Sequence, residues 1–422
     1  MAFPAASLAR LAPLPWKALE RVAADLDAPI SAVLDGRAAE RELDRFLRAR
    51  RDLARDERAA AAEAIFGVGL WRRRLAWHLG AGGAHAPPRH LLVALVRDLA
   101  GVEDAERLAA ALVDARGSVP RRAGAPEDLA TFYSLPDWLA ETLVREVGDD
   151  APALADALCL PGPVFLRANL LRTSRDALAE RLAAEGIATS AGRFAPACLR
   201  VSTPRPNLVG TRAWRDGLFE AQDEGSQLLG SAVGARPGDT VLDLCAGAGG
   251  KTLQLAADVG SSGRVHACDL DAARLARLAT RTRNAGATEI VRVEGVGPPA
   301  SLRVDRAIVD APCSELGPLR RGPDLRFRID AASFRELPRI QLELLSRAAQ
   351  HVKTGGTLVY ATCTLRREEN EEVASAFERD HVGWRRVAPE LDPLLLDDRG
   401  ALRAWPHAHG TDAVFAVAWR RG

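Results

Sequence analysis

The chain has 422 residues, of which 47% are hydrophobic and 27% charged, and its formal net charge is +1. This length predicts two or three domains. No apolar run is long enough to cross a bilayer, and the N-terminus lacks the charged and then apolar layout of a secretion signal, so no membrane partner is expected. The charge balance argues against a uniformly cationic protein, although one basic surface would suffice to bind nucleic acid.

Six cysteines are spread along the chain, and none belongs to a CxxC pair. This pattern argues against a disulfide framework and against structural zinc. We therefore expect a cytoplasmic protein without a metal. Four of the six are interpreted as small buried hydrophobic residues: Cys159, Cys198, Cys245 and Cys268.

Residues 8–143 show only a helical pattern. Ile65, Val68, Trp71, Leu75 and Leu79 recur at three- and four-residue spacings, which predicts one apolar stripe on a long helix. A solvated helix face explains any single arginine near this stripe, whereas their density favours contact with an RNA backbone. These arginines are Arg45, Arg48, Arg50, Arg51, Arg55, Arg72, Arg73 and Arg74.

The middle of the chain predicts a small α+β lobe. Ala123–Pro126 is a plausible boundary, and Pro136 suits the first turn of a further helix. Pro161–Pro163 then interrupts the chain. Val164–Asn169 reads as a strand, and Ser174 as the cap of the helix that follows.

After Ala235 strands alternate with helices, which predicts right-handed crossovers and a largely parallel sheet. A helix is expected at Ala272–Ala285. Strands are expected at Thr240–Cys245, Arg264–Asp269, Glu289–Val293, Val304–Val309 and Thr357–Ala361, with an edge strand at Val414–Trp419. The expected domains are a helical RNA-binding domain (residues 1–145), an α+β linker lobe (146–234) and a Rossmann-like domain (235–422).

A glycine-rich loop follows the first strand of the third domain, and it predicts a site for a nucleotide-like cofactor. Its residues are Cys245, Ala246, Gly247, Ala248, Gly249, Gly250 and Lys251. Asp269 ends the second strand, where an acid can accept both hydroxyls of a ribose; alternatively it caps the next helix. NAD, FAD and S-adenosylmethionine all remain open at this point. Lys251 is either part of the site or a solvated cation.

Two further strand ends carry thiols. Asp310 and Cys313 follow one apolar strand, and Cys363 follows the next. Each cysteine alone is best explained by packing, but two at neighbouring carboxyl ends of a parallel sheet favour thiol chemistry.

Several motifs together resemble the Sun-type (Nol/Nop/Sun) RNA cytosine-C5 methyltransferases. They are Arg167–Arg172, Phe219–Gln227, Asp243–Thr252, Asp310–Ser314, Arg320–Asp324, Tyr360–Thr364 and Glu368–Asn370. The helical first third is similar to the NusB-like domain of the bacterial member that acts on small-subunit ribosomal RNA. The resemblance implies an α/β, Rossmann-like methyltransferase domain preceded by an all-α NusB-like domain and a small α+β lobe.

The resemblance also implies the chemistry. Cys363 is the nucleophile that adds to carbon 6 of cytosine, Asp310 contacts N3 of the ring, and Cys313 helps to remove the proton from carbon 5. S-adenosylmethionine is then the cofactor held by the glycine-rich loop, Asp269 and Asp310. The partner is RNA, with a single-stranded or loop target because the base must leave its stack. A monomer is expected.

Arginines close in sequence to Cys313 are candidates to hold RNA phosphates. They are Arg320, Arg321, Arg326 and Arg328, and a solvated loop explains them equally well.

The sequence departs from the family pattern in four places. Ala248 replaces a proline, Glu315-Leu316 replaces a pair of small residues, and Asp412-Ala413 replaces Asp-Gly. The family's acid after the third strand is absent from Val293–Gly297, where Glu294 could substitute for it.

Three rival functions remain. The same chemistry on transfer RNA is disfavoured by the NusB-like region, and a noncatalytic RNA-binding assembly factor would use the same fold without methyl transfer. A small-molecule methyltransferase would leave the two thiols and the arginine-rich helices unexplained.

Overall fold

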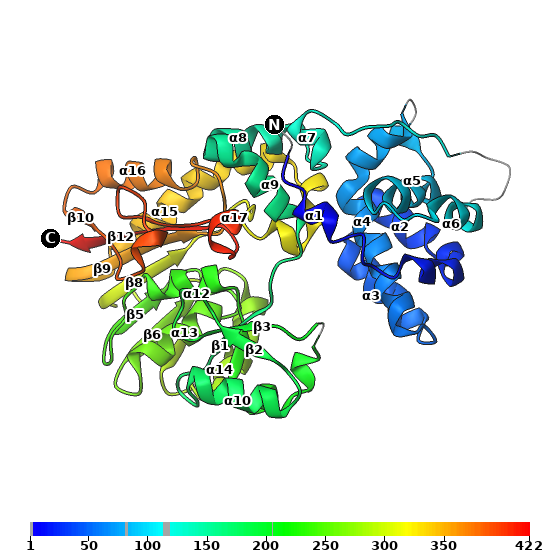
Figure 1. Cartoon of the computed structure of the whole chain (residues 1–422). Helices are drawn as coiled ribbons and strands as arrows, with labels where there is room; N and C mark the ends of the chain where they lie inside the picture. Colours follow the sequence, from blue (N-terminus) through cyan, green and yellow to red (C-terminus); the bar gives the residue numbers. More distant parts are fainter. Residues whose placement is uncertain (1–2, 81–82, 113–118, 205) are drawn as a thin grey trace. The chain divides into compact units, whose positions relative to one another are not determined.

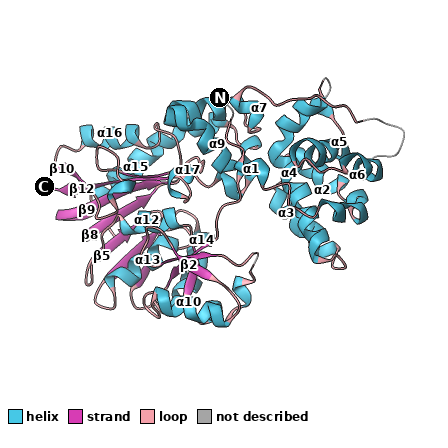
Figure 2. Ribbon diagram, viewed as in Figure 1, coloured by secondary structure: helices cyan, strands magenta, loops and turns pink. Residues whose placement is uncertain are grey.

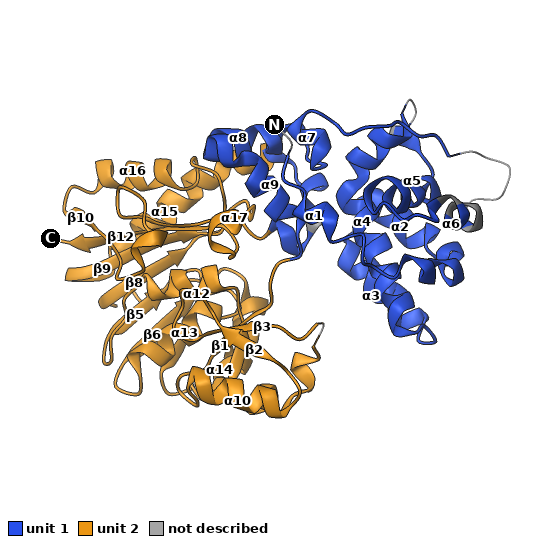
Figure 3. Cartoon of the chain, in the orientation of Figure 1, with its two compact units in different colours: residues 1–161, 319–331 blue, residues 162–318, 332–422 orange. Residues whose placement is uncertain are grey.

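The structure is a computed structural model that describes residues 3–80, 83–112, 119–204 and 206–422 (Figure 1). It divides into two compact units (Figure 3). The first comprises Met1–Pro161 with Leu319–Ala331, and the second comprises Gly162–Pro318 with Ala332–Gly422. The first long segment therefore ends inside the Pro-Gly-Pro interruption. The division into three domains stays a proposal.

The described part of the first unit is helical throughout, as the sequence pattern predicts (Figure 2). Its α-helices are α1 (Ala6–Ala9), α2 (Asp27–Leu34), α3 (Ala39–Ala49), α4 (Arg55–Leu79), α5 (Pro88–Ala94), α6 (Ala105–Leu112), α7 (Leu129–Phe132), α8 (Asp137–Val147) and α9 (Ala151–Cys159). Short 3₁₀ or π turns lie at η1 (Trp16–Arg21), η2 (Ala23–Asp25), η3 (Gly83–His85), η4 (Leu95–Leu99), η5 (Gly148–Asp150), η7 (Leu319–Arg321) and η8 (Pro323–Phe327), and η9 (Ala331–Glu336) follows. Residues 81–82 and 113–118 of the predicted helical pattern lie outside the described residues.

Helix α4 supplies the core of this unit. The five residues of its predicted stripe, from Ile65 to Leu79, are all buried. Two of its neighbouring arginines are structural: Arg74 is buried and donates to the carbonyl of Phe132, and Arg73 donates to the carbonyl of Leu135. The expected RNA-backbone contact is therefore wrong for Arg74, because burial removes its guanidinium from solvent.

Residues 319–331 complete the helical unit from far along the chain. Asp324 accepts a hydrogen bond from the backbone N–H of Ala39 at 3.3 Å, and Arg72 lies over the ring of Phe327 at 3.8 Å. Arg326 is fully buried and donates to the carbonyl of Leu158 at 2.9 Å. This segment is therefore packed into the unit that the first third of the sequence forms.

The second unit begins with the small α+β lobe. Its antiparallel sheet has the order β2-β3-β1-β4. The elements are β1 (Phe165–Ala168), α10 (Arg175–Ala184), β2 (Thr189–Ala191), β3 (Cys198–Val201), η6 (Leu208–Gly210), α11 (Arg212–Arg215), β4 (Phe219–Ala221) and α12 (Glu224–Ser231). The Ser174 hydroxyl accepts a hydrogen bond from the N–H of Ala177, which confirms the predicted helix cap.

The larger sheet of the second unit has the strand order β10-β12-β9-β8-β5-β6-β7, and β11 also pairs with β12. Its strands are β5 (Thr240–Asp243), β6 (Arg264–Cys268), β7 (Val291–Gly295), β8 (Val304–Asp310), β9 (Val352–Thr362), β10 (Trp384–Val387), β11 (Leu402–Ala404) and β12 (Val414–Arg421). The helices are α13 (Gly250–Val259), α14 (Ala272–Ala285), α15 (Leu337–Ala349), α16 (Glu371–Asp380) and α17 (Pro406–His409), with a turn at η10 (Pro393–Leu395). Five neighbouring strands of this sheet are parallel: β7, β6, β5, β8 and β9. Their carboxyl ends therefore lie on the same side of the sheet.

One strand prediction is wrong in position. Val414–Trp419 does form a strand, but β12 lies inside the sheet because β9 pairs with one side of it and β10 and β11 with the other. Strands β10 and β11, which are only four and three residues long, were not predicted from the sequence. Short antiparallel strands carry too little alternation to be recognised.

Within the described residues, no helix is long and apolar enough to cross a membrane. The same residues contain no group of three or more His, Cys, Asp and Glu side chains that could hold a metal ion.

Candidate active site

The glycine-rich loop joins β5 to α13 and depends on two glycines with positive φ. Gly247 has φ 56° and Gly249 has φ 93°. Both angles lie in the left-handed region of backbone conformation, which residues with a Cβ rarely adopt. A Cβ on Gly249 would lie 2.2 Å from Cδ1 of Leu278, whereas a Cβ on Gly247 would meet nothing within 4 Å. The backbone of Gly249 is therefore packed against the protein, and that of Gly247 borders open space.

The small lobe braces this loop. Arg167 on β1 is buried and donates to the carbonyl of Gly250 at 3.1 Å. Arg281 on α14 donates both to the carbonyl of Ala248 and to Glu220 on β4, each at 2.6 Å. The lobe thus fixes the position of the loop in the second unit.

Asp269 follows β6 and holds the loop from the other side. Its Oδ2 accepts a hydrogen bond from the N–H of Gly247 at 2.8 Å, and its Oδ1 accepts one from Asp271 at 2.8 Å. The cap of α14 is Asp271, whose carboxylate accepts from the N–H groups of Ala273 and Arg274. The alternative interpretation of Asp269 as the cap of that helix is therefore wrong.

Lys251 and Asp310 form an ion pair at 2.6 Å, which links the first turn of α13 to the end of β8. The Lys251 side chain is only 12% exposed, so the interpretation as a solvated cation is wrong. Burial lowers the pKa of Lys251, but the charge of Asp310 and its hydrogen bond outweigh this and raise it overall. The charge of Cys363 acts in the same direction. Lys251 is therefore a fixed positive charge beside both groups.

The two predicted thiols meet in the structure. Sγ of Cys313 lies 3.4 Å from Sγ of Cys363. The hydrogen bond to Cys363, burial and the charge of Cys363 raise the pKa of Cys313 well above its ordinary value. Cys313 therefore keeps its proton at neutral pH.

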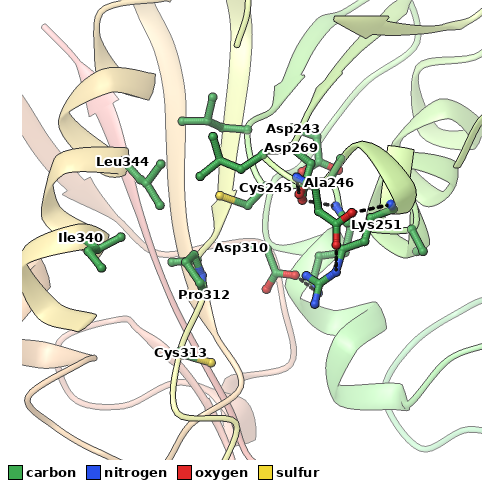
Figure 4. Close-up of a pocket in the computed structure, with 18 of the residues that line it drawn as sticks. Asp243, Cys245, Ala246, Lys251, Asp269, Asp310, Pro312, Cys313, Ile340 and Leu344 are labelled. Carbon is green, nitrogen blue, oxygen red and sulfur yellow. Dashed lines mark hydrogen bonds and ion pairs between the residues drawn. The ribbon is translucent and has the colours of Figure 1, made fainter. Parts of the chain in front are cut away.

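A cavity of about 610 Å³ opens at these strand ends (Figure 4). All the residues predicted to bind the cofactor line it except Gly249, and both thiols line it as well. Figure 4 shows Asp269 and Asp243 on one side of the cavity, with Asp310 and Cys313 further along it. The volume is within the range of about 300–1,000 Å³ that is usual for small-molecule and cofactor sites.

Other lining residues were not predicted from the sequence. Asp243 is buried at the end of β5, where its Oδ2 accepts from the hydroxyl of Thr252 at 2.7 Å and its Oδ1 has no hydrogen-bond partner among the described residues. Burial raises the pKa of Asp243 to about 7. Asp243 ends an apolar strand, as Asp310 does, so its place in the sequence could have indicated that it belongs to the site. Apolar or mixed side chains come from α15 and from the loops after β6 and β7: Ile340, Leu344, Arg347, Leu270 and Val296.

The structure shows where the residues at two of the departures from the family pattern lie. Glu294 lies 2.7 Å from Nδ1 of His266 and does not line the cavity, so the structure does not bring it to the position of the missing acid. Glu315 lines the cavity with φ 52°, a left-handed conformation that residues other than glycine rarely adopt.

The arginines predicted to hold phosphates belong to the helical unit. Arg326 is fully buried and bonded to carbonyl groups, so the prediction is wrong for that residue. Arg320 is also buried, whereas Arg321 and Arg328 are exposed. Their part in RNA binding stays a prediction.

Comparisons with known proteins identify the family of the chain. Residues 231–420 match the family described as 16S rRNA methyltransferase RsmB/F, and residues 135–207 match its ferredoxin-like domain. A protein of Synechocystis named Probable ribosomal RNA small subunit methyltransferase B is 37% identical over 302 residues, which cover 68% of this chain and 67% of the relative. The chain belongs to the RsmB/F family.

A second relative supports the RsmB/F assignment, and solved structures support the fold. The protein of the same name from Bacillus subtilis is 33% identical over 310 residues, which cover 69% of this chain and 68% of that protein. The crystal structure of PH0851 has a TM-score of 0.74 at 22% identity and covers 94% of this chain and 98% of its own. NSun6 from Pyrococcus horikoshii, solved with SFG, has a TM-score of 0.61 at 20% identity and covers 68% and 98%. The fold is therefore the predicted one, and the RsmB/F chain is an RNA methyltransferase that uses S-adenosylmethionine.

Proposed function

We propose that the chain methylates carbon 5 of a cytosine in small-subunit (16S) ribosomal RNA, through a covalent bond between Cys363 and carbon 6 of the ring. The observation that carries this proposal is the pair of sulfur atoms 3.4 Å apart beside Asp310, at the end of a cavity suited to a cofactor. The relatives from Synechocystis and Bacillus subtilis, which are named for the small ribosomal subunit, support the choice of RNA.

Carbon 5 of cytosine is a weak nucleophile, so the reaction needs prior activation of the ring. The Cys363 thiolate donates its electron pair to carbon 6, and the displaced ring electrons make carbon 5 nucleophilic. Asp310, once it has taken up a proton, donates a hydrogen bond to N3 and so stabilises the negative charge that the ring acquires. S-adenosylmethionine supplies a methyl group on a positively charged sulfur.

Lys251 is suited to support the nucleophile. Its charge is fixed by the 2.6 Å ion pair with Asp310, and it interacts favourably with the negative charge of Cys363. The thiolate is the reactive form of a cysteine, so a fixed cation nearby favours the attacking species.

Cys313 acts after the methyl group has been transferred. Two of the three causes that raise its pKa are the hydrogen bond to Cys363 and the charge of Cys363. When Cys363 becomes bonded to carbon 6, its charge is lost and these two causes disappear. Cys313 can then release its proton to water and accept the proton of carbon 5, and the electrons of that C–H bond re-form the double bond and expel Cys363 as a thiolate.

The residues present fit S-adenosylmethionine. The unpartnered Oδ1 of Asp243 is an acceptor for the ammonium group of the cofactor, and Asp269 is an acceptor for its ribose. Gly247 leaves room for close approach to the backbone, and the apolar side chains of Leu270 and Val296 are suited to contact adenine.

The test is incubation with labelled S-adenosylmethionine and unmodified small-subunit ribosomal RNA, with transferred methyl groups and protein–RNA adduct as the two readouts. We expect transfer by the wild type, none by Cys363→Ala, and an accumulated adduct with Cys313→Ala. Methyl transfer to transfer RNA alone would mean that transfer RNA, and not ribosomal RNA, is the substrate. If the wild type binds RNA but transfers to neither RNA, a noncatalytic assembly factor becomes the better interpretation.

A further inference from the structure

Glu369 is a fully buried carboxylate in the loop between β9 and α16, outside the cavity. Four hydrogen bonds reach it. Ser314 donates twice, from its N–H at 2.9 Å and its hydroxyl at 2.6 Å, while Gln341 donates at 3.0 Å and Arg366 at 3.3 Å. Such a set of donors satisfies a buried negative charge.

The network connects the residues that follow the two thiols. Ser314 follows Cys313 and Thr364 follows Cys363, and the hydroxyls of Ser314 and Thr364 lie 2.6 Å apart. Because the Ser314 hydroxyl donates to Glu369, the Thr364 hydroxyl must donate to Ser314. One chain of hydrogen bonds therefore joins both cysteine loops to a single carboxylate.

Strand pairing alone does not set the distance between the thiols. The register of β8 with β9 ends at the pair Asp310 and Ala361, before either cysteine is reached. Beyond that point the N–H of Ala311 still donates to Ala361, and the N–H of Gly317 donates to the carbonyl of Cys363. Neither bond holds the segment that carries Cys313 itself, whereas the two bonds that Ser314 donates to Glu369 do.

Gln341 anchors the same carboxylate to α15. Its Nε2 donates to the carbonyl of Pro312 at 2.9 Å as well as to Glu369. The residues on both sides of Cys313 are thereby tied to one buried group, and a shift of Glu369 would move the loop on both sides of the thiol.

We propose that Glu369 is a positioning residue that keeps Cys313 and Cys363 in hydrogen-bonding contact. It touches no reacting atom and acts through Ser314 and Thr364. Its importance for methyl transfer rests on the two-thiol mechanism proposed above, but its effect on the distance between the sulfur atoms does not.

The test uses the full chain with Glu369→Gln, and with Glu372→Gln as the matched control because Glu372 is exposed on the same stretch of chain. The first readout needs neither RNA nor cofactor. Diamide oxidises the two thiols to a disulfide, taking up two protons and two electrons to become a hydrazine, and mass spectrometry follows the Cys313–Cys363 bond. The second readout is single-turnover methyl transfer with the KM for RNA, and thermal unfolding monitors the fold.

We expect Glu369→Gln to slow disulfide formation about tenfold and methyl transfer about 10²-fold, with KM changed less than about threefold, because a small displacement of reacting groups costs rate more than binding. Glu372→Gln should match the wild type. Thr364→Val keeps the side-chain shape and removes the hydroxyl, so it replaces Glu369→Gln if that variant does not fold.

A folded Glu369→Gln or Thr364→Val protein with wild-type rates of disulfide formation would overturn the proposal. If the wild type transfers no methyl group while Glu369→Gln still slows disulfide formation, the two-thiol function fails and the positioning role stands.

Discussion

The sulfur atoms of Cys313 and Cys363 lie 3.4 Å apart, and Cys363 is responsible for two of the three causes that raise the pKa of Cys313. Cys363→Ala should therefore lower the pKa of Cys313, although burial keeps it above its ordinary value. At a fixed pH of about 8.5, near the ordinary pKa of a thiol, Cys313 should react faster with iodoacetamide in the variant than in the wild type. Peptide mass spectrometry measures the rate, and an equal or slower rate would contradict the assigned cause.

Asp243 should make the stability depend on pH. Burial raises its pKa to about 7 in the folded chain, from an ordinary value of 3.8. Below about pH 4 the carboxyl group is protonated in both states, and between there and pH 7 only the unfolded chain ionises, so the wild type loses stability on the order of 4 kcal/mol as the pH rises. Asp243→Asn lacks this loss. Urea unfolding measures the free energy of unfolding of both proteins. As the pH rises across this range, this free energy should fall for the wild type relative to Asp243→Asn.

Cofactor binding should release a proton at the same residue. The ammonium group of S-adenosylmethionine favours the ionised form of Asp243, so at pH 7 about half a proton should be released per cofactor bound. Calorimetry in two buffers with different heats of ionisation measures this number. Asp243→Asn is the control and should release none; equal release by both proteins would exclude Asp243 as the source.

The two glycines of the cofactor loop should respond differently to alanine. Gly249→Ala places a Cβ 2.2 Å from Leu278 at φ 93° and should lower the free energy of unfolding by about 2–3 kcal/mol. Gly247→Ala meets no atom, so the cost should be only about 1 kcal/mol from its left-handed conformation. The second variant should instead weaken binding of S-adenosylmethionine. Thermal unfolding and calorimetry on both variants check the contrast, which fails if Gly247→Ala binds normally.

Substitutions of Arg326 and Arg321 should affect two different properties, the stability of the fold and the affinity for RNA. Arg326→Ala leaves the carbonyl of Leu158 unpaired and empties a buried site, so it should destabilise the helical unit by about 3 kcal/mol. Arg321→Ala changes an exposed side chain, so it should lower RNA affinity with little effect on unfolding. Filter binding at several salt concentrations, paired with thermal unfolding, tests both. Normal stability of Arg326→Ala would contradict the structural role.

The elements that carry local signals were predictable from the sequence. The helix at Ala272–Ala285 was predicted with the bounds that α14 has, because its apolar period is regular and Gly286 ends it in a left-handed conformation. The loop, Asp269, Asp310 and the thiols were also recognisable, since each lies at or shortly after the end of an apolar strand. The structure brings these residues to one cavity.

The remaining features depend on contacts between residues that are far apart in sequence. The burial of Arg326 follows from its packing against Leu158, and the lining of the cavity by α15 follows from the packing of that helix against β8 and β9. Neither is encoded in a local pattern of residues. Glu369 illustrates the same limit, because its role depends on donors that come from three different segments.

The return of residues 319–331 to the helical unit constrains the order in which the protein can fold during synthesis. Ala39 and Leu158 emerge from the ribosome early, but their partners Asp324 and Arg326 follow only after β5 to β8 have been made. The helical unit therefore cannot be finished first, as a simple N-terminal domain would be. A fragment that stops at Pro161 would lack part of its own interior, so exchange of this unit between relatives requires two segments of the gene to be moved together.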